Sequence, residues 1–112
     1  LDVLSGGRFE LGLGAGWMRE DYAGAGIAFD PPATRIARLA EAVTVIKGLF
    51  ADGPCSFSGD HFCVAMEGTP KPVQRPHPPI LIGGGGRSIL TLASREAEST
   101  EVFEMWNKDG AK

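Results

Sequence analysis

The sequence predicts an α/β fold with parallel strands, and three observations support this fold class. Residues 8–14 alternate between apolar and small or polar side chains, which is typical of a strand. Residues 80–82 form a short apolar run that enters four consecutive glycines, as expected of a parallel strand covered on both faces. A helical pattern follows each strand, at residues 35–50 and 88–97. This alternation of strands and helices is characteristic of a parallel α/β protein.

Composition excludes several classes of partner. The chain has 112 residues, a hydrophobic fraction of 43% and a formal net charge of −3. These values fit one ordinary globular domain. No apolar run approaches the length of a membrane span, and no basic patch marks a nucleic-acid site. We therefore expect neither a membrane nor a nucleic acid as partner.

Two cysteines flank a predicted hairpin over residues 56–64. His61 lies between Cys55 and Cys63, but Asp60 is the only candidate fourth ligand and there is no C-x-x-C pair. We expect no metal site here. Two thiols without such a pattern favour small buried side chains in a reducing, cytoplasmic compartment.

The first strand is expected to have one small face. Residues 1–4 resemble the last turn of a helix that Gly6 and Gly7 stop, so the chain is expected to begin inside a larger unit. Along the strand that follows, one face is apolar and the other carries glycines and a carboxylate, the latter being Glu10, Gly12 and Gly14. Because protein interiors are close-packed, such a face is expected to line a cavity that something else occupies.

A first glycine loop, residues 14–16, ends this strand. Gly14-Ala15-Gly16 resembles half of a dinucleotide-binding motif, but Trp17 stands where the third glycine is needed. The loop suits a flat ring lying against the backbone better than a pyrophosphate. Trp17 and Met18 either contact such a ring or cover the edge of the core, and the sequence leaves both interpretations open.

The middle of the chain is expected to be structural. A helical turn over residues 20–26 leads to Asp30-Pro31-Pro32, which begins a long helix. The charged side chains of that helix are interpreted as solvated surface; they are Arg35, Arg38, Glu41 and Lys47. Residues 69–79 carry five prolines and form an extended lead-in to the second strand, with His77 as a connector residue. A further strand is expected at residues 102–106.

A second glycine loop, residues 83–88, is the predicted anion site. Each glycine costs roughly 0.5–1 kcal/mol of backbone entropy relative to alanine, so four in a row are unlikely to serve stability. Free N–H groups, a helix N-terminus and a guanidinium together suit a phosphate. The candidate residues are Gly83, Gly84, Gly85, Gly86, Arg87 and Ser88. A flexible turn without a ligand is the alternative.

Size points to a larger architecture. Two parallel strands with their helices cannot bury both sheet faces and hide both edges. A (β/α)8 (TIM) barrel needs about 250 residues, so the chain is expected to be a fragment, or a subunit that needs partners. In such a barrel the two glycine loops would lie on one rim, where ligands bind.

Three stretches of the sequence form a recognisable set: LDVLSGGRFELGLGAGW at residues 1–17, FDPP at 29–32 and PVQRPHPPILIGGGG at 72–86. Together they closely resemble the luciferase-like monooxygenase superfamily, nearest to its deazaflavin (coenzyme F-420)-dependent oxidoreductases. The resemblance covers residues 1–97 and implies the central part of a (β/α)8 barrel, about strands four and five with their helices and a small inserted β-hairpin. Residues 98–112 depart from the family and are expected to be a divergent or weakly structured end.

The resemblance also implies a cofactor, either FMN or coenzyme F-420. The first glycine loop, with Gly14, Ala15 and Gly16, would lie against it, and the second would take its phosphate. Ala15 stands where the luciferases proper have a phosphate-binding arginine, which favours the deazaflavin. The implied activity is hydride transfer or oxygen activation on a small-molecule substrate. No catalytic residue is assigned, since Glu10 and Glu20 are candidates by position only.

Two other functions remain open. One is a truncated, non-catalytic barrel fragment that acts only by association through its strand edges, for example as a homo-oligomer. The other is a small nucleotide-binding module, which binding of NAD without any flavin would support.

Overall fold

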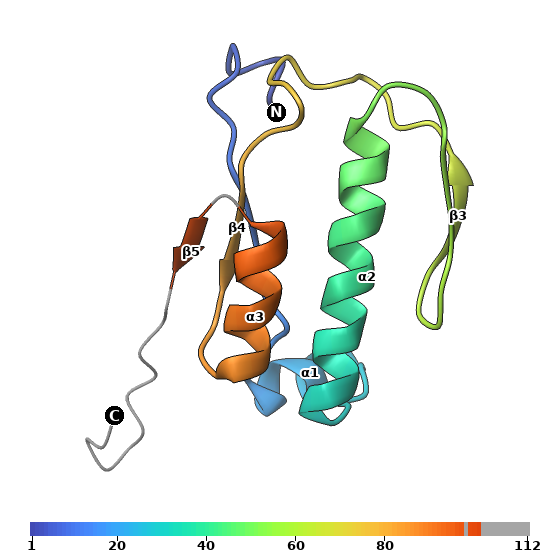
Figure 1. Ribbon diagram of the computed structural model, residues 1–112. Helices are drawn as coiled ribbons and strands as arrows, with labels where there is room; N and C mark the ends of the chain where they lie inside the picture. Colours follow the sequence, from blue (N-terminus) through green and yellow to red (C-terminus); the bar gives the residue numbers. More distant parts are fainter. Residues whose placement is uncertain (98, 102–112) are drawn as a thin grey trace.

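The computed structural model describes residues 1–97 and 99–101. A three-stranded sheet carries two helices, α2 (Pro32–Phe50) and α3 (Arg87–Glu96), side by side on one face (Figure 1). A two-stranded hairpin lies on the far side of α2. The α/β class predicted from the sequence is confirmed.

The sheet is parallel throughout. Its strands are β1 (Leu11–Leu13), β4 (Ile80–Gly83) and β5 (Ser99–Glu101), in the order β1-β4-β5. Leu11 pairs with Ile80 and Leu13 with Ile82, so β1 and β4 end at the same edge. The predicted pairing of the two strands is thus confirmed, although β1 is shorter than the expected residues 8–14.

The third strand lies earlier than expected. It forms over residues 99–101, in parallel with β4, on a stretch too polar to be predicted as a strand. Pairing to the backbone of β4 is independent of side-chain type, which explains how polar residues enter the sheet. The strand expected at residues 102–106, like most of the predicted divergent end, lies outside the described residues.

The long helix α2 has a stabilising residue at each end. Pro32 is the first residue of α2, a position where the missing N–H costs nothing. At its other end the Lys71 ammonium donates to the carbonyls of Leu49 and Gly53, at 3.0 and 3.1 Å. A cation there complements the negative end of the helix dipole. None of the helices in the described residues is both long and apolar enough to cross a membrane.

The core lies between the sheet and the two long helices. Ile80 and Ile82 of β4 are fully buried, and Val43 of α2 is fully buried against them. The other buried members are Leu39, Ile89, Leu92 and Ala93. Ile80 and Ile82 therefore supply the centre of the core. Leu81 between them is only half-buried, so the expected cover of this strand on both faces is not present within the described residues.

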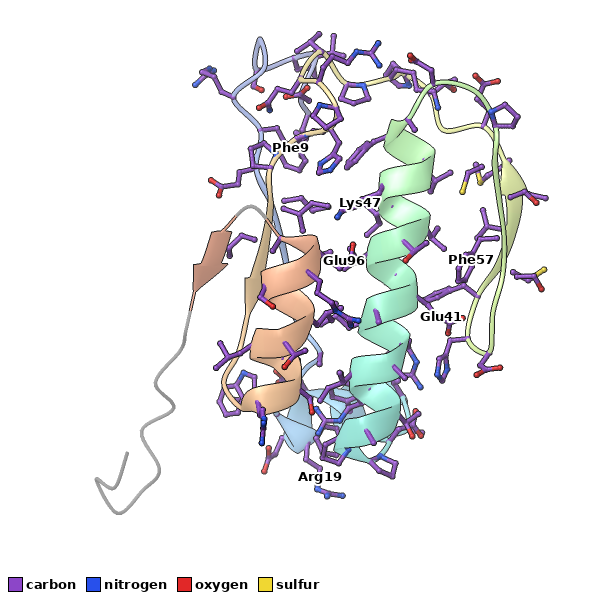
Figure 2. All side chains as sticks on the ribbon, in the orientation of Figure 1. Phe9, Arg19, Glu41, Lys47, Phe57 and Glu96 are labelled. Atoms are coloured by element: carbon purple, nitrogen blue, oxygen red, sulfur yellow. The ribbon has the colours of Figure 1, made fainter. Side chains whose placement is uncertain are left out.

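Charged residues of α2 bind neighbouring elements instead of only facing solvent, and here the sequence-based interpretation is wrong. Glu41 accepts a hydrogen bond from the backbone N–H of His61 at 2.8 Å. Lys47 pairs with Glu96 of α3 at 3.0 Å, joining the two helices (Figure 2). These contacts were invisible in the sequence because they join residues 20 and 49 positions apart.

The hairpin forms close to its predicted position. Strands β2 (Cys55–Ser58) and β3 (Cys63–Met66) are antiparallel, with Ser58 opposite Cys63. Cys55 is buried beside α2, whereas Cys63 is exposed, so the expectation of two buried thiols is wrong for Cys63. Both thiols are free, so the pair forms no disulfide.

A buried carboxylate connects the N-terminus to the proline-rich segment. Residues 1–5 form a helical turn, in which the Ser5 N–H donates to the Leu1 carbonyl at 2.9 Å. Asp2 is only 5% exposed and accepts hydrogen bonds from the N–H groups of Val73 and Gln74. Burial raises the pKa of Asp2, but these hydrogen bonds outweigh it, and the pKa lies below its ordinary value of 3.8.

The helix between the first glycine loop and α2 is short. α1 (Arg19–Ala25) follows the first glycine loop and ends at Gly26, whose φ of 71° is left-handed. It lies at the same end of the molecule as the first residues of α2 and α3 (Figure 1). That end is also the carboxyl edge of β1 and β4.

Candidate functional site

The two glycine loops leave adjacent strands at one edge of the sheet. Residues 14–16 follow β1 and residues 83–88 include the end of β4, and the two strands are paired in parallel. A Cβ built on Gly14 would lie 3.7 Å from the carbonyl oxygen of Gly83. The predicted meeting of the loops at one edge is therefore confirmed.

The sheet face turned away from the helices is poor in side chains. Gly12 and Gly14 are exposed on this face, and a Cβ on Gly12 would meet only the Leu81 side chain, at 3.7 Å. Alternation along β1 puts Glu10 on the same face. The small face predicted from the sequence is thus present and is not filled by side chains of the described residues.

The second glycine loop opens α3 with free N–H groups. Within the described part of the chain, no carbonyl or side chain accepts from the N–H groups of Gly85, Gly86, Arg87 or Ser88. The first intrahelical partner is reached only at Leu90, whose N–H donates to the Gly86 carbonyl at 3.1 Å. Gly86 has a φ of 94°, which L-residues with a side chain rarely adopt. The loop therefore presents several backbone donors at the positive end of a helix.

A groove runs between the first turns of α2 and α3. Arg87 and Ser88 line it on one side, and Ala33, Ile36 and Ala37 on the other. Its volume is about 530 Å³. Among the described residues no carboxylate pairs with Arg87, so its guanidinium is available to an anion.

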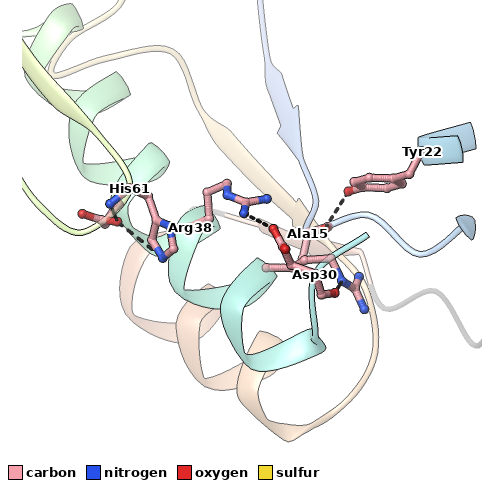
Figure 3. A network of polar contacts seen from close by, with 7 residues as sticks. Ala15, Tyr22, Asp30, Arg38 and His61 are labelled. Carbon is pink, nitrogen blue, oxygen red and sulfur yellow. Dashed lines mark hydrogen bonds and ion pairs between the residues drawn. The ribbon is translucent and has the colours of Figure 1, made fainter. Parts of the chain in front are cut away.

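The first glycine loop is held from outside by side chains of α1 and α2. The Tyr22 hydroxyl donates to the Ala15 carbonyl at 3.3 Å (Figure 3). The Arg35 Nη1 donates to the Gly16 carbonyl, and its Nε donates to the Asp30 carbonyl at 2.9 Å. Arg35 is thus a structural contact of the loop, which corrects its interpretation as solvated surface.

An aromatic ring orders these side chains. The Phe29 ring lies 4.9 Å from that of Tyr22 in an edge-to-face arrangement. The guanidinium of Arg35 stands 4.3 Å from the Phe29 ring centre and that of Arg19 at 4.8 Å. Arg38 pairs with the Asp30 carboxylate (Figure 3). This cluster was not predicted from the sequence. Its one sequence signal is an aromatic residue followed by an acidic one, at positions 29 and 30, just before a helix with arginines in its first two turns.

Ala15 and Trp17 point in different directions. The Ala15 side chain packs against the core, so only the backbone of this residue is left to contact a ligand. Trp17 is 65% exposed. The interpretation that Trp17 covers the core edge is therefore wrong for the described chain, and its ring is available to a ligand or to further protein.

A parallel α/β unit with two such loops at its carboxyl edge has the form of a nucleotide- or flavin-cofactor protein. The chain belongs to the luciferase-like monooxygenase family, whose model matches residues 1–112. This confirms the superfamily to which the sequence motifs point.

Relatives with known names agree with this assignment. The chain is 31% identical over 99 residues to an FMNH2-dependent dimethylsulfone monooxygenase of Pseudomonas putida, a match that covers 88% of this chain and 27% of that protein. It is 38% identical over 64 residues to the pyrimidine monooxygenase RutA of Variovorax paradoxus, covering 55% and 17%.

A solved structure shares the fold. The crystal structure of the monooxygenase RslO1 from Streptomyces bottropensis superposes with a TM-score of 0.61 at 26% identity, covering 75% of this chain and 25% of that one. The chain thus spans about a quarter of the length of the first relatives it matches, at 27%, 23% and 29%.

Proposed function

We propose that the chain is part of a flavin- or deazaflavin-dependent oxidoreductase, in which its two glycine loops bind the cofactor. The observation that carries this proposal is the meeting of both loops at the carboxyl edge of β1 and β4. Ligands of parallel α/β proteins bind at that edge. The family supports a flavin, because one relative is named as FMNH2-dependent.

The second glycine loop is proposed to take the cofactor phosphate. Its donors are the N–H groups of Gly85, Gly86, Arg87 and Ser88, none of which has an acceptor within the described residues. The dipole of α3 and the Arg87 guanidinium add positive potential at the same point. A dianionic phosphate fits this set of donors better than a neutral group would.

The first glycine loop is proposed to lie against the cofactor ring. Gly12 and Gly14 leave their part of the adjacent sheet face without side chains, and a flat ring needs such a surface to approach the backbone. The exposed ring of Trp17 offers an apolar contact beside it. The bound cofactor would supply the redox chemistry, and this chain would supply orientation and charge neutralisation.

FMN and coenzyme F-420 remain two candidates for this site. The named relative favours FMN. The residue at position 15 favours the deazaflavin, because the family resemblance implies a phosphate-binding arginine there in the luciferases proper, and this chain has Ala15. Both cofactors carry a ring and a phosphate, so both fit the proposed roles of the two loops, one of which contacts the ring while the other binds the phosphate.

The proposal includes a larger architecture. Residues 1–97 would be the central part of a (β/α)8 barrel, about strands four and five, with the hairpin of β2 and β3 inserted. The edge of β1 and the small sheet face would then contact the rest of the barrel. The substrate would be a small molecule, bound beside the cofactor ring, and the location would be cytoplasmic.

Titration of the full-length protein tests the proposal. Isothermal calorimetry with FMN and with coenzyme F-420, run in parallel, should show one-to-one binding of one of them. NAD is the control, because a nucleotide-binding module of another class would bind it and neither flavin. Binding of NAD alone, or of none of the three ligands, would overturn the proposed function.

A second candidate function is association without catalysis. Leu1 and Leu4 are 81% and 88% exposed, and one edge of β1 is unpaired within the described chain. Exposed apolar residues and a free strand edge favour association with other chains. Sedimentation equilibrium of this 112-residue chain tests this candidate, since a monomer at micromolar concentration would contradict it.

A further inference from the structure

Two successive carbonyl oxygens of the first glycine loop are held by side chains. The Ala15 oxygen accepts from the Tyr22 hydroxyl at 3.3 Å, and the Gly16 oxygen accepts from Arg35 Nη1. Tyr22 belongs to α1 and is seen beside Ala15 in Figure 3, and Arg35 belongs to α2. The loop is thus fixed through two of its acceptors.

Fixing these carbonyls also fixes two donors. In a planar trans peptide the C=O and the next N–H point in opposite directions. The N–H groups of Gly16 and Trp17 are therefore turned away from Tyr22 and Arg35. Within the described part of the chain neither N–H group has an acceptor. Each of these two adjacent donors thus points away from the side chain that holds its peptide group, and both remain free for a ligand.

The side chains that hold the loop are themselves held by further contacts. The Arg35 guanidinium lies over the Phe29 ring at 4.3 Å and donates through Nε to the Asp30 carbonyl at 2.9 Å. The Tyr22 ring packs edge-to-face on the same Phe29. A planar guanidinium can stack on a ring while its N–H groups donate in fixed directions, whereas an ammonium has no plane that stacks. Arg35 therefore transmits a fixed geometry from α2 to the loop.

The fit between the loop and this cluster is close. Gly16 has a φ of 84°, and a Cβ at this position would collide with the Tyr22 hydroxyl. Tyr22 thus occupies the space that any side chain at position 16 would need. The glycine permits both the backbone turn and the approach of the hydroxyl.

We propose that Arg35 and Tyr22 are positioning residues, which hold the N–H groups of Gly16 and Trp17 toward acceptor atoms of the cofactor ring. This role rests on the proposed function, because it presupposes that the ring lies against this loop. The ligand chemistry is a flat heteroaromatic ring with carbonyl oxygens or unprotonated ring nitrogens on one edge. The phosphate loop is not involved.

The test compares two arginine variants of the full-length protein. Arg35→Gln removes the guanidinium at the loop, and Arg75→Gln is the matched control. Arg75 forms an exposed ion pair with Asp52 and lies in the segment that leads into the opposite end of β4. Dissociation constants are measured for FMN and for riboflavin, which has the same ring without the phosphate. Melting temperatures show that each variant is folded.

Arg35→Gln is expected to weaken FMN and riboflavin binding by the same factor, about tenfold. Tyr22→Phe, which keeps the ring on Phe29 and removes only the hydroxyl, should have a smaller effect in the same direction. Arg75→Gln should leave both constants unchanged. A purely structural role of Arg35 would lower the melting temperature without this equal loss for the two ligands, and that result would overturn the proposal. Loss of FMN binding alone would also overturn it, because the phosphate would then be the group affected.

A second readout needs no ligand. Chymotrypsin cleaves after Trp17 only when the loop unfolds locally and enters the protease active site. Because Arg35→Gln removes a contact that holds the loop, it should speed this cleavage about tenfold relative to Arg75→Gln. An unchanged cleavage rate would overturn the positioning role, whatever the cofactor. Faster cleavage in a protein that binds none of FMN, riboflavin and coenzyme F-420 would overturn the proposed function. It would also overturn the claim that the N–H groups face a cofactor ring, and only the claim that Arg35 fixes the loop would stand.

Discussion

Gln74 donates its side-chain Nε2–H to the Asp2 carboxylate at 2.7 Å, across 72 positions of sequence. The same side chain also donates to the Phe9 carbonyl at 2.7 Å. The N-terminal turn, the residues before β1 and the proline-rich lead-in to β4 are therefore joined at one carboxylate. These contacts set how β1 meets β4 at the amino edge of the sheet, opposite the glycine loops.

This carboxylate gives the first prediction, a pH dependence of stability. The hydrogen bonds to Asp2 lower its pKa in the folded state below 3.8. A lowered folded pKa contributes stability that is present above the unfolded value and is lost as pH falls through the folded value. Asp2→Asn should therefore lower the melting temperature at pH 7, and the difference from wild type should shrink below pH 4. Thermal melts across pH 2.5–7 test this. A difference that stays constant over this range would contradict it.

The second prediction concerns the contact between Lys47 and Glu96. Their side chains are 27% and 36% exposed, and the ion pair joins α2 to α3. Partly exposed ion pairs of this kind contribute about 0.5 kcal/mol to the free energy of unfolding after solvent screening. A double-mutant cycle with Lys47→Met and Glu96→Gln, followed by urea unfolding, should give a coupling of this size. The coupling should fall at 1 M salt. A salt-independent coupling would show that packing, not charge, joins the two residues.

The elements that could be predicted from the sequence are those with a local signal. The alternation before Gly14 and the apolar run before Gly83 each identify a strand, because side-chain period is a property of a few neighbouring residues. Once both strands are parallel neighbours, their loops must meet at one edge. The candidate site of residues 14–16 and 83–88 therefore followed from short stretches alone.

The parts that were missed depend on tertiary placement. Arg35 looks like any surface arginine of an amphipathic helix until the fold brings Gly16 beside it. Asp2 and Gln74 have no common pattern in the sequence. The strand β5 carries polar residues, and only the free edge of β4 makes it a strand. In each case the deciding partner is distant in the sequence, so no local pattern identifies it.

The third prediction concerns the fit at Gly16. Gly16→Ala combines a left-handed φ of 84° with a collision against the Tyr22 hydroxyl. The free energy of unfolding should fall by about 2 kcal/mol, of which the backbone strain is one part. Tyr22→Phe in the same chain should recover some of the loss by removing the colliding oxygen. Urea unfolding of the single and double variants measures both.

Gly24→Ala is the matched control for this substitution. Gly24 lies inside α1, and a Cβ there would meet nothing within 4 Å. Replacing a helical glycine by alanine stabilises by about 0.5–1 kcal/mol. The two glycines should therefore respond with opposite signs. Destabilisation at both positions would mean that α1 as a whole, not the contact between Gly16 and Tyr22, is sensitive to substitution.

The last prediction tests the second glycine loop. Arg87→Ala combined with Gly85→Val removes the guanidinium and places a branched side chain among the free N–H groups at the start of α3. Both residues are exposed, so the fold should tolerate the change and the melting temperature should fall only a little. FMN or F-420 affinity should fall at least 100-fold, because charge-assisted hydrogen bonds to phosphate contribute about 1.5–3 kcal/mol each. Riboflavin affinity should not change. Unchanged FMN and F-420 affinity would remove phosphate binding from this loop, whereas equal losses for riboflavin and FMN would place the ring, not the phosphate, against it.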